Sequence, residues 1–190
     1  MTAQKLDGIW YYYLSLEQDL ANTSRYIEPA GQENAYSFEF AKLLILSCTE
    51  VESVFKMICK EIEGTDVKGD IGEYKRVILG EFPKIVDAVV TIIRWGKSIK
   101  PFEEWSTGKL TWWDAYQNVK HYRGDFFSAA TYKNVATALS ALYILIFYLA
   151  KICKLDIRHR DDINQYIASD YTIQLLCERP EHELPDFEGV

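Results

Sequence analysis

The feature that most constrains the fold is a run of 17 residues without a charge, NVATALSALYILIFYLA, between Lys133 and Lys151. Apolar residues occupy every face of this segment, which is typical of a helix that is buried on all sides. Its length is borderline for a membrane span, and it contains an Asn, a Thr and a Ser. We therefore expect a soluble protein without membrane contact, in which residues 126–154 form one nearly fully buried helix.

Length and charge limit the classes of function. The chain has 190 residues, enough for one domain with a sizeable core. Its net charge of −7 argues against general binding to duplex DNA, which needs a positive surface. The first ten residues lack the basic start and apolar run of a signal peptide, so a cytoplasmic location is expected. The chain has cysteines at Cys48, Cys59, Cys153 and Cys177, and none of them forms a Cys-x-x-Cys pair. We therefore expect reduced thiols, no metal site and no cofactor.

Hydrophobic periodicity predicts an all-α fold, an antiparallel bundle of four to five helices. We expect Pro83 to begin the third long helix, Thr111 to cap the fourth and Gly124 to interrupt it. Residues 1–155 are expected to form the bundle and residues 156–190 a polar C-terminal extension. The expected helices cover residues 6–27, 36–62, 74–79 (short), 83–95, 112–123 and 126–154, and a short strand is suggested over 171–177.

Residues 111–127, TWWDAYQNVKHYRGDFF, contain the candidate functional site. On a helix, Asp114, Asn118 and His121 fall on one stripe because they are separated by four and three residues. Gln117 lies beside this stripe. Asp114 and Gln117 are therefore candidate ligand contacts. The opposite side of the helix is apolar and is expected to face the core, with Trp112, Tyr116 and Val119.

This combination of side chains suits proton transfer next to a phosphate. Histidine titrates near neutral pH, and Asn118 could orient His121. Lys120 lies about a quarter turn from His121. Lys120 and Arg123 could hold a phosphate, provided that a break at Gly124 turns Arg123 away from the apolar side.

A second interpretation of the same residues is structural. Any amphipathic helix shows a polar stripe opposite an apolar one, so the stripe could simply be a solvated surface. The many aromatic residues favour a site, because they would hold the helix rigidly. These residues are Trp112, Trp113, Tyr116, Tyr122, Phe126 and Phe127.

A helical bundle with an Asn-Lys-His-Arg cluster late in the chain resembles the HEPN superfamily, small all-α domains common in prokaryotic toxin–antitoxin and anti-phage systems. Segment 101–131 also resembles a group of uncharacterised bacterial proteins that share its Trp-Trp and Lys-His-x-Arg pattern. The resemblance implies a metal-independent endoribonuclease that acts on RNA or a nucleotide. It further implies a homodimer with the two motifs facing each other, and an antitoxin or other protein as partner.

The resemblance matches His121 to the catalytic His of the family and Asn118 to its polar residue. Ribonucleases of the family carry an Arg shortly before that His, whereas here Arg123 follows it. Two hypotheses therefore stand. The protein is either an RNA-acting enzyme or a non-catalytic helical module, whose Asn-Lys-His-Arg cluster binds a phosphate ligand or serves the structure.

Overall fold

The computed structural model describes residues 1–92, 95–155 and 186. Its main elements are five α-helices, which confirms the all-α fold class. They are α1 (Ala3–Thr23), α2 (Phe38–Glu63), α3 (Ile71–Glu81), α4 (Thr111–Phe126) and α5 (Tyr132–Ile152). The connections contain the 3-10 helices η1 (Pro83–Asp87), η2 (Glu103–Ser106) and η3 (Phe127–Ala129) and the strands β1 (Val90–Ile92) and β2 (Lys97–Ile99). The strand suggested over 171–177 lies outside the described residues.

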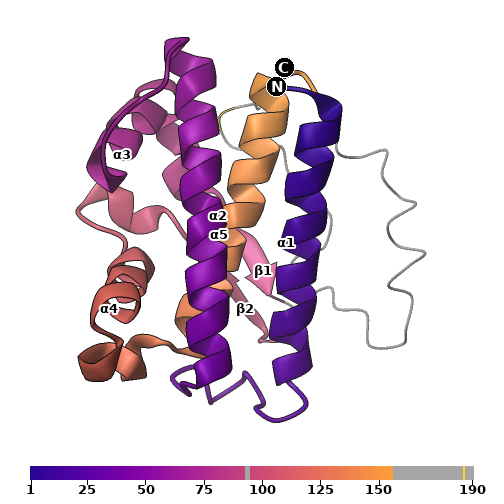
Figure 1. Cartoon of the computed structure of the whole chain (residues 1–190), viewed down its shortest axis with the longest axis vertical. Coiled ribbons are helices and arrows are strands. Elements are labelled where there is room, and N and C mark those ends of the chain that lie inside the picture. The colour runs from indigo at the N-terminus through magenta and orange to yellow at the C-terminus, as the bar shows by residue number, and fades with distance from the viewer. Residues whose placement is uncertain (93–94, 156–185, 187–190) are drawn as a thin grey trace.

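The bundle is organised around α5, which packs against α1, α2 and α4. Helix α1 lies on one side of α2, and α3 and α4 lie on the other (Figure 1). Helices α2 and α5 begin at the same end, because the residues that precede them, Tyr36 and Thr131, pair through an isolated β-bridge. Helix α1 therefore runs antiparallel to α2 and α5, whereas α2 and α5 run parallel to each other (Figure 1).

Helix α5 is buried on nearly every side, as the uncharged run predicts. Its two polar residues in the middle are tolerated because each hydroxyl donates to its own helix backbone. Thr137 Oγ1 donates to Lys133 O, and Ser140 Oγ donates to Ala136 O, both at 2.8 Å. The helix is long and apolar enough to cross a membrane, but 78% of its apolar 18-residue stretch is buried inside the bundle. The core helix of a soluble protein shows the same pattern, and the absence of membrane contact stays a prediction.

The predicted start of this helix at residue 126 is wrong. Helix α4 continues to Phe126, η3 follows, and α5 begins only at Tyr132. Thr131 is the N-cap, and its side chain accepts a hydrogen bond from the Asn134 amide at 3.2 Å. Apolar residues at positions 126, 127, 129 and 130 continue the hydrophobic pattern and conceal this boundary in the sequence.

The predicted third helix over residues 83–95 is also wrong. Pro83 begins only the short helix η1, and β1 and β2 then form an antiparallel hairpin with Val90 opposite Ile99. Two properties explain the hairpin. Val90, Thr91 and Ile92 are β-branched and favour extended backbone, and Gly96 adopts a left-handed φ of 68° in the turn. The short helix predicted over 74–79 is longer than expected and forms α3.

Glu17 on α1 is a carboxyl inside the core, with 7% of its surface exposed. Burial raises the pKa of Glu17 to about 8, although a hydrogen bond from the Tyr13 hydroxyl at 3.0 Å acts in the opposite direction. The folded protein therefore keeps a proton on Glu17 at pH values where the unfolded chain, at the ordinary value of 4.5, has lost it.

We predict that the stability of the protein falls as pH rises from about 4.5 to about 8. In this window the folded state binds more protons than the unfolded state, and the loss is on the order of 5 kcal/mol. Glu17→Gln cannot ionise and should show a much flatter profile. Urea unfolding at a series of pH values measures this, with the exposed Glu81→Gln as control. Parallel profiles for Glu17→Gln and the wild type would contradict the prediction.

Candidate functional site

The first half of α4 is fixed to the body by its tryptophans. Trp112 is fully buried, and its indole Nε1 donates to the carbonyl of Pro101 at 2.8 Å. Trp113 lies against Phe55 of α2, with ring centroids 6.1 Å apart. Tyr116 packs edge-on against Trp113 at 5.1 Å. The predicted apolar side of α4 is therefore confirmed, since Trp112, Tyr116 and Val119 are all buried.

The start of α4 differs from the prediction. Thr111 is the first helical residue, and Leu110 occupies the N-cap position without a side-chain cap. The carboxylate of Glu104, in η2, replaces the cap because its Oε2 accepts a hydrogen bond from the Thr111 amide at 2.6 Å. A negative charge at this position also interacts favourably with the helix dipole. A contact between residues seven positions apart in an irregular segment leaves no periodic signal in the sequence.

The second half of α4 leaves the body. Every residue from Lys120 to Phe126 is exposed, and we call this stretch the exposed segment. The backbone bends within it at Tyr122, where φ is −136° and ψ is 40°. The predicted interruption at Gly124 therefore lies two residues too late. The sequence also predicted that this break would turn Arg123 away from the apolar side, and the Arg123 side chain is indeed exposed.

Lys120 is held in place by an aromatic neighbour. Its Nζ donates to the Tyr116 hydroxyl at 3.1 Å and lies 5.2 Å from the centre of the same ring. The hydrogen bond to Tyr116 raises the pKa of Lys120, so the ammonium stays charged throughout the neutral range. Tyr116 is therefore a positioning residue for the cluster. A spacing of four residues on one helix could have indicated this pair.

The predicted stripe is present, but its members do not bond to one another. Asp114 and His121 are exposed, and Asn118 and Gln117 are half-buried. Within the described part of the chain, the contact recorded for His121 is with the Tyr122 ring, whose centroid lies 6.3 Å away. The structure therefore places His121 in solvent beside Arg123, without a side chain that fixes the orientation of its ring. The catalytic and ligand-binding roles of these residues stay predictions.

Only part of the predicted aromatic support exists. Trp112, Trp113 and Tyr116 are buried and fix α4, as expected. Tyr122 and Phe126 instead face solvent, with 63% and 43% of their surfaces exposed. Exposed rings at these positions cannot stiffen the helix, but they add apolar surface next to the charged groups.

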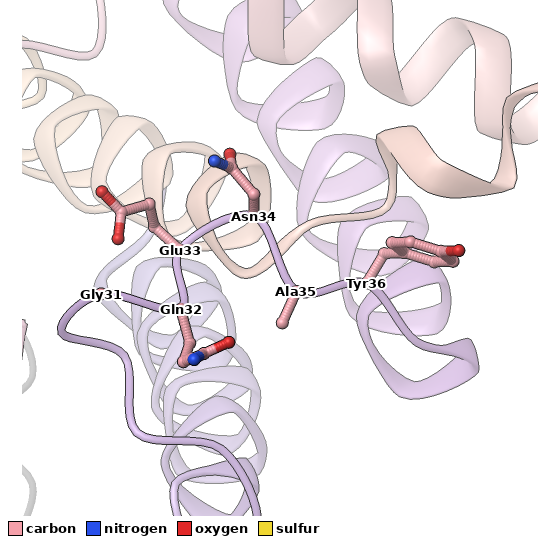
Figure 2. Close-up of a pocket in the computed structure, with 6 residues that line it drawn as sticks. All are labelled: Gly31, Gln32, Glu33, Asn34, Ala35 and Tyr36. Atoms are coloured by element: carbon pink, nitrogen blue, oxygen red, sulfur yellow. The ribbon is translucent and has the colours of Figure 1, made fainter.

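A hollow elsewhere on the surface is a weaker candidate. It is lined by residues 31–36 in the loop between α1 and α2. Its one charged side chain, Glu33, is already engaged by Lys97 at 2.6 Å, which lowers the pKa of the carboxyl. Figure 2 shows the side chains of Gln32, Glu33 and Tyr36 pointing in different directions. They do not converge on a ligand, and α4 remains the better candidate.

Metal ligands are not grouped in the described part of the chain, which holds no set of three or more His, Cys, Asp or Glu residues suited to a metal ion. The described cysteines, Cys48, Cys59 and Cys153, are unbridged. The basic run at residues 158–160 lies outside the described residues.

We predict that Glu104→Ala destabilises the protein by about 0.5–2 kcal/mol, because the Thr111 amide loses its cap. Glu103→Ala is the matched control, since the neighbouring Glu103 is exposed and caps nothing. Thermal unfolding of the two variants measures the difference. An equal effect of both substitutions would show that the carboxylate of Glu104 does not cap α4.

Comparison with known proteins identified no relative of this chain. No protein-family model matches the chain, and no curated protein and no solved structure matches it.

Proposed function

We propose that this protein binds RNA through the exposed segment of α4. Lys120 and Arg123 contact the phosphates, and His121 lies between them beside the backbone of the bound strand. The observation that carries the proposal is that these two cations are exposed and have no carboxylate partner in the described structure.

Several other cations on the described surface are already paired with carboxylates. Ion pairs to Asp or Glu are formed by Lys42, Lys56, Lys60, Arg76, Lys97 and Lys100. Lys120 bonds instead to a hydroxyl, which leaves its positive charge available. A phosphate can therefore bind at Lys120 and Arg123 without breaking an existing ion pair. This local charge is compatible with the acidic net charge, because charges farther than about 10 Å are largely screened at physiological salt.

The shape of the segment also suits an extended strand. The bend at Tyr122 keeps three consecutive side chains, His121, Tyr122 and Arg123, exposed. Arg offers paired donors to a phosphate, and a tyrosine ring offers a face to a base. The resemblance to the HEPN superfamily supports RNA as the ligand and bacterial defence or a toxin–antitoxin pair as the setting.

Cleavage of the bound RNA is the second candidate, favoured by the exposed imidazole of His121. His121 would take the proton from a ribose 2′-hydroxyl, whose oxygen then bonds to phosphorus while the bond to the 5′-oxygen breaks. The products would be a 2′,3′-cyclic phosphate and a 5′-hydroxyl, and Arg123 would stabilise the charge that develops on the phosphate. A homodimer, which the resemblance implies, would supply a second His121 to protonate the leaving oxygen.

The binding proposal predicts that Arg123→Ala weakens binding to a labelled single-stranded RNA. Loss of one phosphate contact should also reduce the slope of log K against log salt by about 0.7. Fluorescence anisotropy at several salt concentrations measures both quantities. Arg25→Ala is the matched control, because Arg25 is an exposed arginine at the end of α1. Equal affinities and slopes for the two variants would refute the proposal.

The cleavage candidate predicts that His121→Ala slows RNA cleavage in EDTA by about a hundredfold or more. Its RNA affinity and melting temperature should change little, because the side chain is exposed. Product analysis by gel and mass spectrometry detects the cyclic phosphate. If the wild type binds RNA but leaves it intact, the protein is a binding module and the catalytic role of His121 is wrong.

A further inference from the structure

Three exposed aromatic side chains and the half-buried Phe127 gather at the end of the bundle where α2 begins. Tyr36 and Phe38 flank the N-cap of α2, Phe126 ends the exposed segment of α4, and Phe127 follows it. Phe38 is 75% exposed, Tyr36 is 53% exposed and Phe126 is 43% exposed. We call these four residues the aromatic surface. Burial of such rings is normally favourable, so an exposed group of them marks a place where something binds.

Phe127 contacts the rings of both Phe38 and Tyr36. The Phe127 centroid lies 4.7 Å from that of Phe38, with the planes 34° apart, and 5.4 Å from that of Tyr36 in an edge-on contact. These contacts join the end of α4 to the start of α2. In the sequence, Arg123 precedes Phe127 by four residues, so the same connection carries the cation and the ring.

The backbone beneath the aromatic surface is fixed. Tyr36 pairs with Thr131 in the β-bridge, and the Tyr132 amide donates to the Ala35 carbonyl at 3.0 Å. On the other side of Tyr36, the Ser37 hydroxyl caps α2 by accepting from the Phe40 amide at 3.1 Å. The rings of Tyr36 and Phe38 therefore stand on two anchored helix ends, and Figure 2 shows Tyr36 projecting away from the loop. A preformed surface loses little entropy on binding.

The chemistry of the surface favours nucleobases as the occupant. The large hydrophobic side chains exposed in the described structure are all aromatic except Val89, and three of them, Tyr36, Phe38 and Phe126, belong to this surface. Every base has a flat face that stacks on such rings. The unpaired cations of the exposed segment supply the complementary charge for the phosphates that accompany the bases. An interface with another protein would not need this combination of bare rings and adjoining free cations.

We propose that the aromatic surface stacks the unpaired bases of a single-stranded RNA whose phosphates lie on Lys120 and Arg123. This inference rests on the proposed function and specifies the ligand as single-stranded, since paired bases in a duplex do not expose their faces. Phe38, the most exposed of the four rings, provides the face that stacks a base, and Tyr36 extends the surface toward the loop between α1 and α2.

The test compares variants that keep or remove the ring. Phe38→Leu retains an apolar side chain but no ring face, whereas Phe38→Tyr retains the face. We expect Phe38→Leu and Tyr36→Leu each to weaken binding of a labelled single-stranded RNA of mixed sequence by about 5-fold or more. Phe38→Tyr should bind like the wild type. Tyr11→Leu is the control for an exposed ring elsewhere, because Tyr11 is 57% exposed on α1.

Two further probes separate bases from phosphates. The same RNA annealed to its complement should bind more weakly than the single strand. Inorganic polyphosphate, which has no bases, should bind wild type and Phe38→Leu equally. If Arg123→Ala lowers RNA affinity but Phe38→Leu and Tyr36→Leu do not, base stacking is wrong and the proposed function stands. If the wild type binds no RNA, both fail. If Phe38→Leu instead converts a dimer to a monomer in light scattering, the surface is a protein interface.

Discussion

Burial of α5 is the constraint on which the rest of the structure depends. A helix with apolar residues on every face must be surrounded, and α1, α2 and α4 pack against it. The hydroxyls of Thr137 and Ser140 in its middle bond to its own backbone, so these two groups need no partner from outside the helix. Because the β-bridge between Tyr36 and Thr131 makes α2 and α5 start together, the chain must travel back along the bundle between them. Helix α3, the hairpin and α4 make that return.

The return path explains why α4 is divided into a buried half and an exposed half. Trp112 and Trp113 fix its beginning to the loop at Pro101 and to Phe55. Its end must then reach Thr131, where α5 begins beside the start of α2. Between these two fixed points, the exposed segment leaves the body, bends at Tyr122 and returns through Phe127. The candidate site therefore lies on a stretch that is held at both ends and open to solvent between them.

The exposed cations and the exposed rings occur in this stretch because it does not cover the core. Residues that cover no core can carry exposed cations, and in the described structure Lys120 and Arg123 keep theirs free of carboxylates. The ring of Phe127, which follows this stretch, lies next to Phe38 because the end of α4 meets the start of α2 there. Two exposed cations followed along the chain by exposed rings suit single-stranded nucleic acid, and we propose RNA binding on this basis.

The sequence by itself determined the fold class and the two sides of α4, because periodic burial leaves a direct trace in the order of residues. The uncharged run identified α5, and the spacing of Trp112, Tyr116 and Val119 identified the core side of α4. Only the tertiary structure decided where α5 begins, that residues 90–99 form a hairpin, and that Glu104 caps α4. It also decided which aromatic residues near the site are exposed. These features depend on single contacts between segments, such as the one from Glu104 to Thr111, or on backbone geometry that competes closely with a helix, and neither leaves a periodic pattern in the sequence.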